Sequence, residues 1–255
     1  MLKVFSYVFQ EVFRNRMLVF YSLFLFLLSS GLFYFGADSS KAVVSLLHVV
    51  LLVVPLLCIV FATIHYYNSL EFIELLLAQP VPRRRIFTGE YLGLSVAMTL
   101  ALLTGLGLPV LFWDTSAASL FLLAMGVMLT FIFTSIAFFA SVSSTDKSKG
   151  IGTALIIWFY YAVIFDGLVL LVLHYFSDYP LEKVVLVLTT LNPIDLARVF
   201  VLLKLDTSAL MGYTGSLFQS FFGTIWGILF SLFFLLLWLV IPLWLSIRIF
   251  TRKDL

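Results

Sequence analysis

The chain has 255 residues, of which 63% are hydrophobic and only 11% are charged. Soluble domains contain about 25% charged residues, so this composition excludes an ordinary soluble protein. The mean hydropathy of +1.16 indicates an integral membrane protein. The formal net charge of +2 gives no indication of nucleic-acid binding, and one cysteine, Cys58, excludes an intrachain disulfide.

Six apolar segments are long enough to cross a membrane, because a helix needs about 20 mostly apolar residues to span a hydrocarbon core about 30 Å thick. The predicted spans are residues 17–35, 42–64, 91–112, 118–140, 151–173 and 224–247. Their apolar residues are continuous rather than alternating, which predicts helices and not barrel strands. The expected fold class is therefore an all-α integral membrane protein, organised as one membrane domain over residues 1–255. The first span has full length and lacks a signal-peptide cleavage pattern, so we expect it to be retained.

The segment before the first span has the periodicity of a helix. Its polar face consists of Lys3, Ser6, Gln10 and Arg14, and its apolar face of Leu2, Phe5, Phe9 and Phe13. This pattern predicts an N-terminal helix lying in the membrane interface. The alternative is that the segment extends the first span into water.

The lysines and arginines are divided unevenly between the two ends of the predicted spans. One end has eleven: Lys3, Arg14, Arg16, Arg83, Arg84, Arg85, Lys147, Lys149, Arg248, Arg252 and Lys253. The other end has four: Lys41, Lys183, Arg198 and Lys204. Because such residues are retained on the cytoplasmic side, we expect both termini and the loop 68–88 in the cytoplasm. The long loop between the fifth and sixth spans is then expected outside.

The loop between the second and third spans contains the stretch NSLEFIELLLAQPVPRRRIF. Asn68 is a favourable N-cap, Glu71 stands at the third helical position, where it can reach back to the cap, and Pro80 ends the helix. About eleven residues at 1.5 Å each give roughly 16 Å, which is too short to cross the membrane. The helix is therefore expected to lie along the cytoplasmic surface.

This short helix is unusually apolar for one that faces water. Glu71 and Glu74 favour its positive end, whereas Phe72 and Leu75 add apolar surface. Such a surface indicates a protein partner, and the residues we single out for docking are Asn68, Glu71, Phe72, Glu74 and Leu75. The alternative is an ordinary interfacial helix whose neighbouring arginines bind anionic lipid headgroups.

The external loop contains a second capped segment, LNPIDLARVFVLLKLD. Asn192 is the predicted cap, and Pro193 occupies the first helical position. With MGYTG after it and FQSFFG before the last span, the segment is expected to form a short helix pair that dips into the outer leaflet. Asp195 and Arg198 are one helical turn apart, and such a pair, if exposed, contributes only about 0.2 to 0.5 kcal/mol. Replacing both by alanine is therefore expected to cost little stability.

Asp166 is the one acid well inside a predicted span. An intramembrane carboxylate costs about 2.5 to 3.5 kcal/mol on insertion scales and usually faces a bundle interior or a cavity. We expect a structural hydrogen bond to a neighbouring helix, and the alternative is a polar lining of a central pathway. The pairs Gly89 with Gly93 and Gly223 with Gly227 have the spacing of close helix contacts.

The sequence carries no motif of an enzyme. The three histidines, His48, His65 and His174, form no His-Glu-x-x-His pattern, and neither a Gly-x-Ser-x-Gly elbow nor the phosphate loop of an ABC ATPase occurs. Cys58 and His65 are seven residues apart on one helical face, as two soft-metal ligands would be. Random placement in an apolar helix explains this spacing better. We therefore expect no catalytic residue, no metal site and no cofactor in this chain.

The sequence resembles those of type 2 ABC exporter permeases. The resemblance is carried by FQEVFRNRMLVFYSLF leading into the first span, the surface helix, the re-entry PVPRRRIFTGEYLG, the six spans and the outer helix. More narrowly, YYNSLEFIELLLAQPVPRRRIFTGEYLG and LNPIDLARVFVLLKLDTSALMGYTG resemble the permease subunits of nitrous oxide reductase maturation systems. The resemblance covers essentially the whole chain.

This resemblance implies a homodimeric, multi-pass permease in the bacterial inner membrane. It also implies two copies of a separate cytoplasmic ATPase, which binds ATP and Mg, and a periplasmic partner involved in assembling the reductase's copper centres. The short cytoplasmic helix would be the coupling helix that docks on the ATPase. We hypothesise that Asn192, Asp195 and Arg198 support the docking surface of the periplasmic partner, or a lid that closes the dimer on its outer side. No nucleic-acid partner is expected.

Two other classes of function stay open at this point. A secondary transporter or channel without an ATPase normally carries several charged or broken-helix features near the midplane, for which Asp166 alone is thin support. A membrane-embedded enzyme is disfavoured because the required group of catalytic residues is missing.

Overall fold

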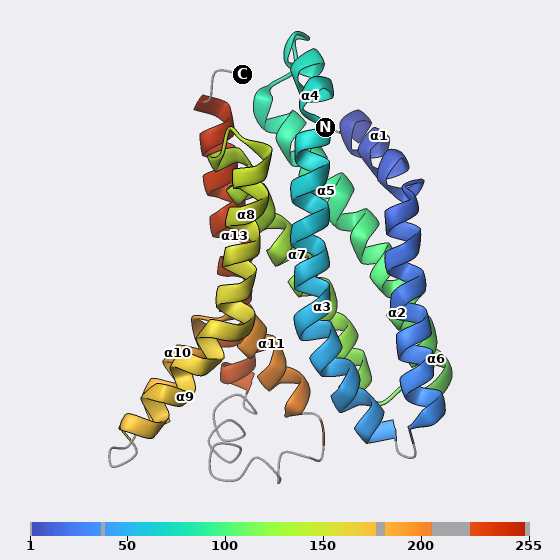
Figure 1. Cartoon of the computed structure of the whole chain (residues 1–255), viewed down its shortest axis with the longest axis vertical. Helices are drawn as coiled ribbons and strands as arrows, with labels where there is room; N and C mark the ends of the chain where they lie inside the picture. The colour runs from blue at the N-terminus through green and yellow to red at the C-terminus, as the bar shows by residue number, and fades with distance from the viewer. Residues whose placement is uncertain (1, 37–38, 177–181, 204, 206–224, 253–255) are drawn as a thin grey trace.

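The computed structural model describes residues 2–36, 39–176, 182–203, 205 and 225–252. These residues form an elongated bundle of helices (Figure 1) and include no strand. The helices are α1 (Leu2–Phe13), α2 (Arg16–Phe35), α3 (Ser39–Asn68), α4 (Leu70–Leu77), α5 (Arg83–Leu102), α6 (Leu108–Trp113), α7 (Ala117–Ser143), α8 (Lys147–Phe159), α9 (Phe165–Tyr175), α10 (Glu182–Thr190), α11 (Pro193–Leu202) and α13 (Ile225–Arg252). Two wider π-helical turns, η1 (Leu103–Gly107) and η2 (Tyr160–Ile164), interrupt the third and fifth spans.

The six predicted spans are confirmed. Six helical segments of the described chain have the length and apolarity to cross a membrane: Arg16–Phe35, Ser39–Asn68, Arg83–Trp113, Ala117–Ser143, Lys147–Tyr175 and Trp226–Arg252. The first five contain the predicted spans, and the sixth overlaps its prediction, whose first residue, Thr224, lies outside the described residues. All-α membrane architecture therefore follows from span length alone.

The core lies around three of the spans. Half or more of the most apolar stretch is buried in α3, in the span from α5 to α6, and in α7. In the α8–α9 span this share is only 6%, and in α13 it is 11%. The last two spans pack on the core through half-buried side chains and leave other apolar side chains, such as Ile156, Leu170 and Trp226, exposed toward lipid or another subunit.

A close contact between α2 and η1 depends on a glycine. A Cβ at Gly105 would lie 2.6 Å from the Ser22 carbonyl oxygen and 2.8 Å from the Leu25 Cβ, so only glycine fits there. The Ser29 hydroxyl donates a hydrogen bond of 3.2 Å to the Gly105 carbonyl oxygen, which further joins the two helices.

The N-terminal segment forms its own helix and does not simply extend the first span. α1 ends at Phe13, and the Asn15 side chain caps α2 by accepting a hydrogen bond from the Met17 amide. The buried residues of α1 are the valines Val4, Val8 and Val12, whereas Phe9 is partly buried against the core and Phe13 is exposed. Gly93 of α5 lies directly against Val8, which confirms a small-residue helix contact at that position. The interfacial location of α1 stays a prediction.

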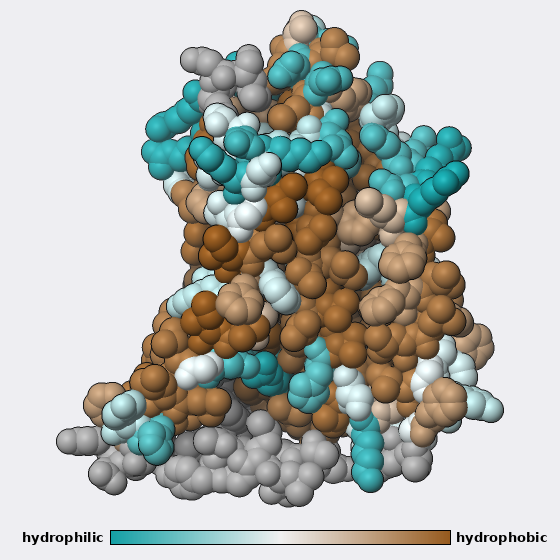
Figure 2. Space-filling model, viewed as in Figure 1, coloured by the Kyte–Doolittle hydropathy of each residue, from teal (hydrophilic) through white to brown (hydrophobic). Residues whose placement is uncertain are grey.

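The start of α1, the end of α13 and α4 lie at one end of the molecule, and α10 and α11 lie near the other (Figure 1). Hydrophilic side chains gather around the α4 end, and apolar ones cover the middle of the visible face (Figure 2). This distribution is that of a bundle with a membrane-crossing middle and a polar end.

On the outer side, α10 and α11 form a helix pair that is bent by 112° at a short break. The bend follows from Pro193, because the residue before a proline is biased away from helical geometry. The stretches MGYTG and FQSFFG, which belong to the segment predicted to form a short helix pair, lie outside the described residues, as does Gly223. Whether this segment dips into the outer leaflet stays a prediction.

Candidate functional site

The predicted cytoplasmic helix is α4, which projects from one end of the bundle (Figure 1). Glu71 and Glu74 are exposed, and Leu75 keeps 68% of its surface exposed, whereas Ile73 is buried against the bundle. The helix ends at Leu77, shortly before Pro80. One face of α4 is thus packed and the other presents acidic and apolar side chains to the surroundings.

The predicted capping by Asn68 is wrong. The helix α3 continues through Asn68, so the residue that precedes α4 is Ser69, which makes no side-chain capping bond. Glu71 therefore occupies the second helical position and not the third. The Asn68 side chain instead accepts a hydrogen bond of 2.9 Å from Lys147 Nζ, at the start of α8. The prediction failed because it ended the second span at Ile64.

Phe72 is engaged within the chain. Its ring stacks on the Tyr7 ring of α1 with the centroids 4.6 Å apart. The surface that α4 leaves for a partner is therefore centred on Glu71, Glu74 and Leu75. Whether these residues contact an ATPase stays a prediction.

A buried polar group where α3, α4 and α5 meet was missed by the sequence analysis. Glu90 of α5 is 1% exposed, and its Oε2 lies 3.2 Å from His65 Nε2 of α3. Ser69, between α3 and α4, lies 3.4 Å from the same histidine nitrogen. The second Glu90 oxygen, Oε1, has no hydrogen-bond partner among the described residues. The available signal was the acid itself, which directly precedes Tyr91, the predicted start of the third span.

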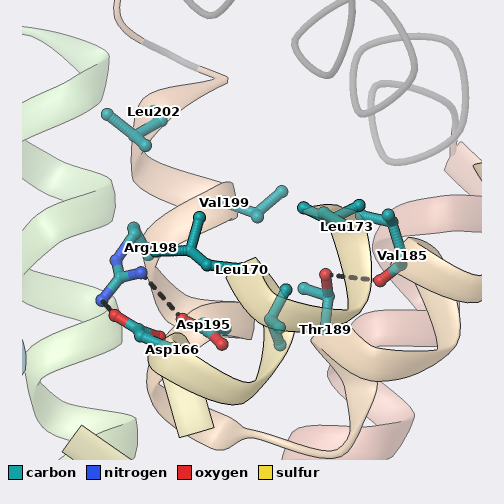
Figure 3. A pocket seen from close by; sticks show the side chains of 10 residues that line it. Asp166, Leu170, Leu173, Val185, Thr189, Asp195, Arg198, Val199 and Leu202 are labelled. Atoms are coloured by element: carbon teal, nitrogen blue, oxygen red, sulfur yellow. Dashed lines mark hydrogen bonds and ion pairs between the residues drawn. The ribbon is translucent and has the colours of Figure 1, made fainter. Parts of the chain in front are cut away.

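At the other end of the bundle, the two groups of residues predicted separately come together in one cluster. The Arg198 guanidinium donates to Asp166 Oδ2 at 3.0 Å, which confirms the expected hydrogen bond from Asp166 to a neighbouring helix. Arg198 Nη1 also lies 2.9 Å from Asp195 Oδ1, as predicted for a local pair. That contact lacks hydrogen-bond alignment, so Asp195 Oδ1 has no hydrogen-bond donor among the described residues. Figure 3 shows Arg198 between the two carboxylates.

This geometry corrects the prediction that replacing Asp195 and Arg198 costs little stability. Asp195 keeps only 13% of its side chain exposed, and Arg198 also holds Asp166, which is 32 positions away. Removing both residues would leave the Asp166 carboxylate without this partner, at a cost of about 1 to 3 kcal/mol rather than a few tenths. The pair is a tertiary contact and not an exposed helical one.

Asn192 joins this cluster to the fifth span. Its Oδ1 accepts a hydrogen bond from the Ile194 amide, which confirms the predicted cap of α11. Its Nδ2 donates to the Tyr161 carbonyl of η2 at 2.9 Å and to Asp195 Oδ2 at 3.0 Å. Asn192 is fully buried, so it positions α11 and presents no surface of its own to a partner.

A cavity of about 280 Å³ lies beside the cluster, between α9, α10 and α11. Its polar lining comes from Asp166, Asp195, Arg198 and Thr189, and the remaining walls are aliphatic. Such a cavity could hold a small molecule with an apolar body and a polar group.

The soft-metal pair considered for Cys58 and His65 does not form. Cys58 lies beside Thr130 and Thr134, whereas His65 faces Glu90. No group of three histidine, cysteine or acidic side chains placed to hold a metal occurs in the described part of the chain.

The chain matches one family of known proteins and two similar relatives. Residues 72–255 match the family described as ABC-2 family transporter protein. A probable ABC transporter permease protein NosY from Pseudomonas aeruginosa is 29% identical over 224 residues, which cover 78% of this chain and 80% of that protein. A protein of the same description from Stutzerimonas stutzeri is 29% identical over 211 residues, which cover 72% and 75%. Because the family match extends over well more than half of its length, the chain belongs to the ABC-2 transporter family, as a permease-type membrane subunit.

Proposed function

We propose that this permease couples ATP hydrolysis by a separate cytoplasmic ATPase either to export or to mechanical transmission to a periplasmic partner. The observation that carries the proposal is α4, a short helix that is packed through Ile73 and exposes Glu71, Glu74 and Leu75. A helix of eight residues is too short to cross a membrane, and its apolar outer surface favours a protein partner.

The proposed assembly is a homodimer with two ATPase copies, which bind the ATP and Mg. It lies in the bacterial inner membrane with both chain termini in the cytoplasm. The homodimer is supported by the outward-facing apolar side chains of the α8–α9 span and α13. The orientation is supported by the eleven lysines and arginines gathered at one end of the spans.

The proposed biological setting is the maturation of the copper centres of nitrous oxide reductase. Its support is the resemblance of the two motifs around α4 and α11 to permeases of such systems, together with the name NosY that both relatives carry. In this setting Asn192, Asp195 and Arg198 hold α11 in place for a periplasmic partner or for closure of the dimer.

The test is charge reversal on α4. We expect Glu71→Lys combined with Glu74→Lys to weaken ATPase binding by about tenfold or more, because unfavourable charge contacts at an interface cost several kcal/mol. The readouts are co-purification of the ATPase and stimulation of ATP hydrolysis, with membrane insertion unchanged. Glu11→Lys is the matched control, because Glu11 is an exposed acid on α1. Normal binding and stimulation by the double variant would exclude α4 as the docking site.

A second candidate function is secondary transport, and one observation favours it. Asp166 and Asp195 line a cavity at the outer end of the fifth span, and intramembrane carboxylates often mark ion or proton paths. Transport by the purified chain without nucleotide would support this candidate against the ATPase-coupled one.

A further inference from the structure

Side-chain hydrogen bonds join the start of α8 to the root of α4, which consists of Tyr67 and Asn68 at the end of α3. The Tyr67 hydroxyl lies 3.2 Å from the Ser141 carbonyl oxygen and 3.3 Å from the Asp146 carbonyl oxygen and can donate to either. Lys147 Nζ donates to Asn68 Oδ1 at 2.9 Å. Tyr67 and Asn68 are the last residues of α3, and α4 begins at Leu70. A displacement of α4 therefore acts directly on the residues that hold α8.

Gly150 allows Tyr67 to lie directly against α8. A Cβ at Gly150 would collide with the Tyr67 hydroxyl and lie 2.7 Å from its Cζ and 2.8 Å from its Cε2. The collision involves the far end of one side chain, so an added methyl group would push Tyr67 away and not break a helix. Gly152, two residues later on the same helix, has nothing within 4 Å of its Cβ position.

The middle of the same span and the start of α9 are hydrogen-bonded to α11. Asn192 donates to the Tyr161 carbonyl in η2, and Arg198 donates to Asp166 in α9. The span thus carries polar contacts to two different elements: the root of α4 at its start, and α11 at η2 and the start of α9.

Between these contacts, α8 packs along α3 and α7. Only 6% of the span's most apolar stretch is buried, compared with 61% for α7. One hydrogen bond, from Trp158 Nε1 to the Leu52 carbonyl oxygen at 3.2 Å, joins it to the middle of α3. A hydrogen-bonded helix is stiff along its axis, so α8 transmits a displacement of its start along α3 and α7 to η2.

We propose that α8, η2 and α9 act as a lever that connects the root of α4 to α11, with Tyr67 and Gly150 as positioning residues at its cytoplasmic end. The lever rests on the proposed function in one respect: the ATPase is what displaces α4. The lever itself is a property of this chain and is testable without the ATPase.

The experiment compares Gly150→Ala with Gly152→Ala in the full chain in lipid nanodiscs. Both variants add the same methyl group to α8, but only the first displaces Tyr67. The readout is hydrogen exchange of the α11 amides from Ile194 to Arg198, next to the contacts with η2 and α9. We expect Gly150→Ala to change their exchange rates by about two- to thirtyfold, the range that residues along a coupled path produce, and Gly152→Ala to leave them unchanged.

A second variant, Tyr67→Phe, keeps the ring and removes the hydroxyl, so it should change α11 exchange in the same direction even if Gly150→Ala folds poorly. Equal α11 exchange rates in the wild type, Gly152→Ala and Tyr67→Phe would overturn the lever. With the ATPase added, nucleotide should alter α11 exchange in the wild type and Gly152→Ala but less in Gly150→Ala. Failure of the ATPase to bind, with the difference between the two glycine variants intact, would overturn the proposed function and leave the lever supported.

Discussion

Asn192 allows the most direct test of the cluster that it forms with Asp166, Asp195 and Arg198, because its buried side chain makes three hydrogen bonds. Alanine at this position removes the cap on the Ile194 amide, at about 0.5 to 2 kcal/mol. It also removes one hydrogen bond to the Asp195 carboxylate, at about 1.5 to 3 kcal/mol, and one to the Tyr161 carbonyl, at about 0.5 to 1.5 kcal/mol. We therefore expect Asn192→Ala to lower the free energy of unfolding by about 2.5 to 6.5 kcal/mol.

Two further variants separate the contributions. Asn192→Ser keeps a capping oxygen and loses both donors, so it should be less destabilising than alanine by about 1 kcal/mol. Asn192→Asp also keeps the cap, but it places a carboxylate where an amide now donates to Asp195 at 3.0 Å, and it should be at least as destabilising as alanine. The assays are denaturant titration in micelles and hydrogen exchange at Ile194. A loss below about 0.5 kcal/mol for Asn192→Ala, typical of an unimportant surface change, would refute the role of this side chain.

Two other predictions concern single carboxylates. Asp166→Asn should fold and lose about 1 kcal/mol of stability, because the pair with Arg198 is one-third exposed. In Asp166→Cys, water-soluble thiol reagents should label position 166 in at least one nucleotide state. Labelling by lipid-soluble reagents alone would exclude a pathway there. The second carboxylate is Asp114, in the loop after α6. Desolvation acts to raise its pKa, but hydrogen bonds from Ser119 and Ser116 together hold the pKa below its ordinary value. A lowered folded-state pKa gives stability that is present above the unfolded pKa of about 3.9 and is lost as the pH falls through the folded value. The wild type should therefore lose stability below about pH 4 relative to Asp114→Asn, and parallel pH profiles of the two proteins would contradict this assignment.

The spans and the position of α4 could be predicted because both depend on local properties. Span length follows from runs of apolar residues, and Pro80 marks where a short helix must stop. The cap of α11 was also predictable, since Asn192 and Pro193 together specify a helix start.

Other features depend on tertiary packing and have no local signal. The apolar row of α1 gave no indication that Val4, Val8 and Val12 are buried, with Val8 lying against Gly93 of α5. The contacts of Arg198 with Asp166 and of His65 with Glu90 join residues 32 and 25 positions apart. Asn68 failed as a cap because α3 continues through it, four residues beyond the apolar run, and its side chain contacts Lys147 of α8.

The location of the Asp166–Arg198 pair bears on how two copies of the chain would meet. About one-third of each side chain is exposed in this single chain, in a span whose remaining surface is mostly apolar. Charged groups in membrane spans usually face a bundle interior or a water-filled cavity, because lipid solvates them poorly. The exposed part of the pair therefore favours an arrangement in which this side of α9 is turned away from lipid. In the proposed homodimer, turning the α8–α9 span toward the second copy would cover both the ion pair and the apolar side chains around it. The lever would then run along the interior of the dimer, where movement of α11 in either copy could open or close the space between them.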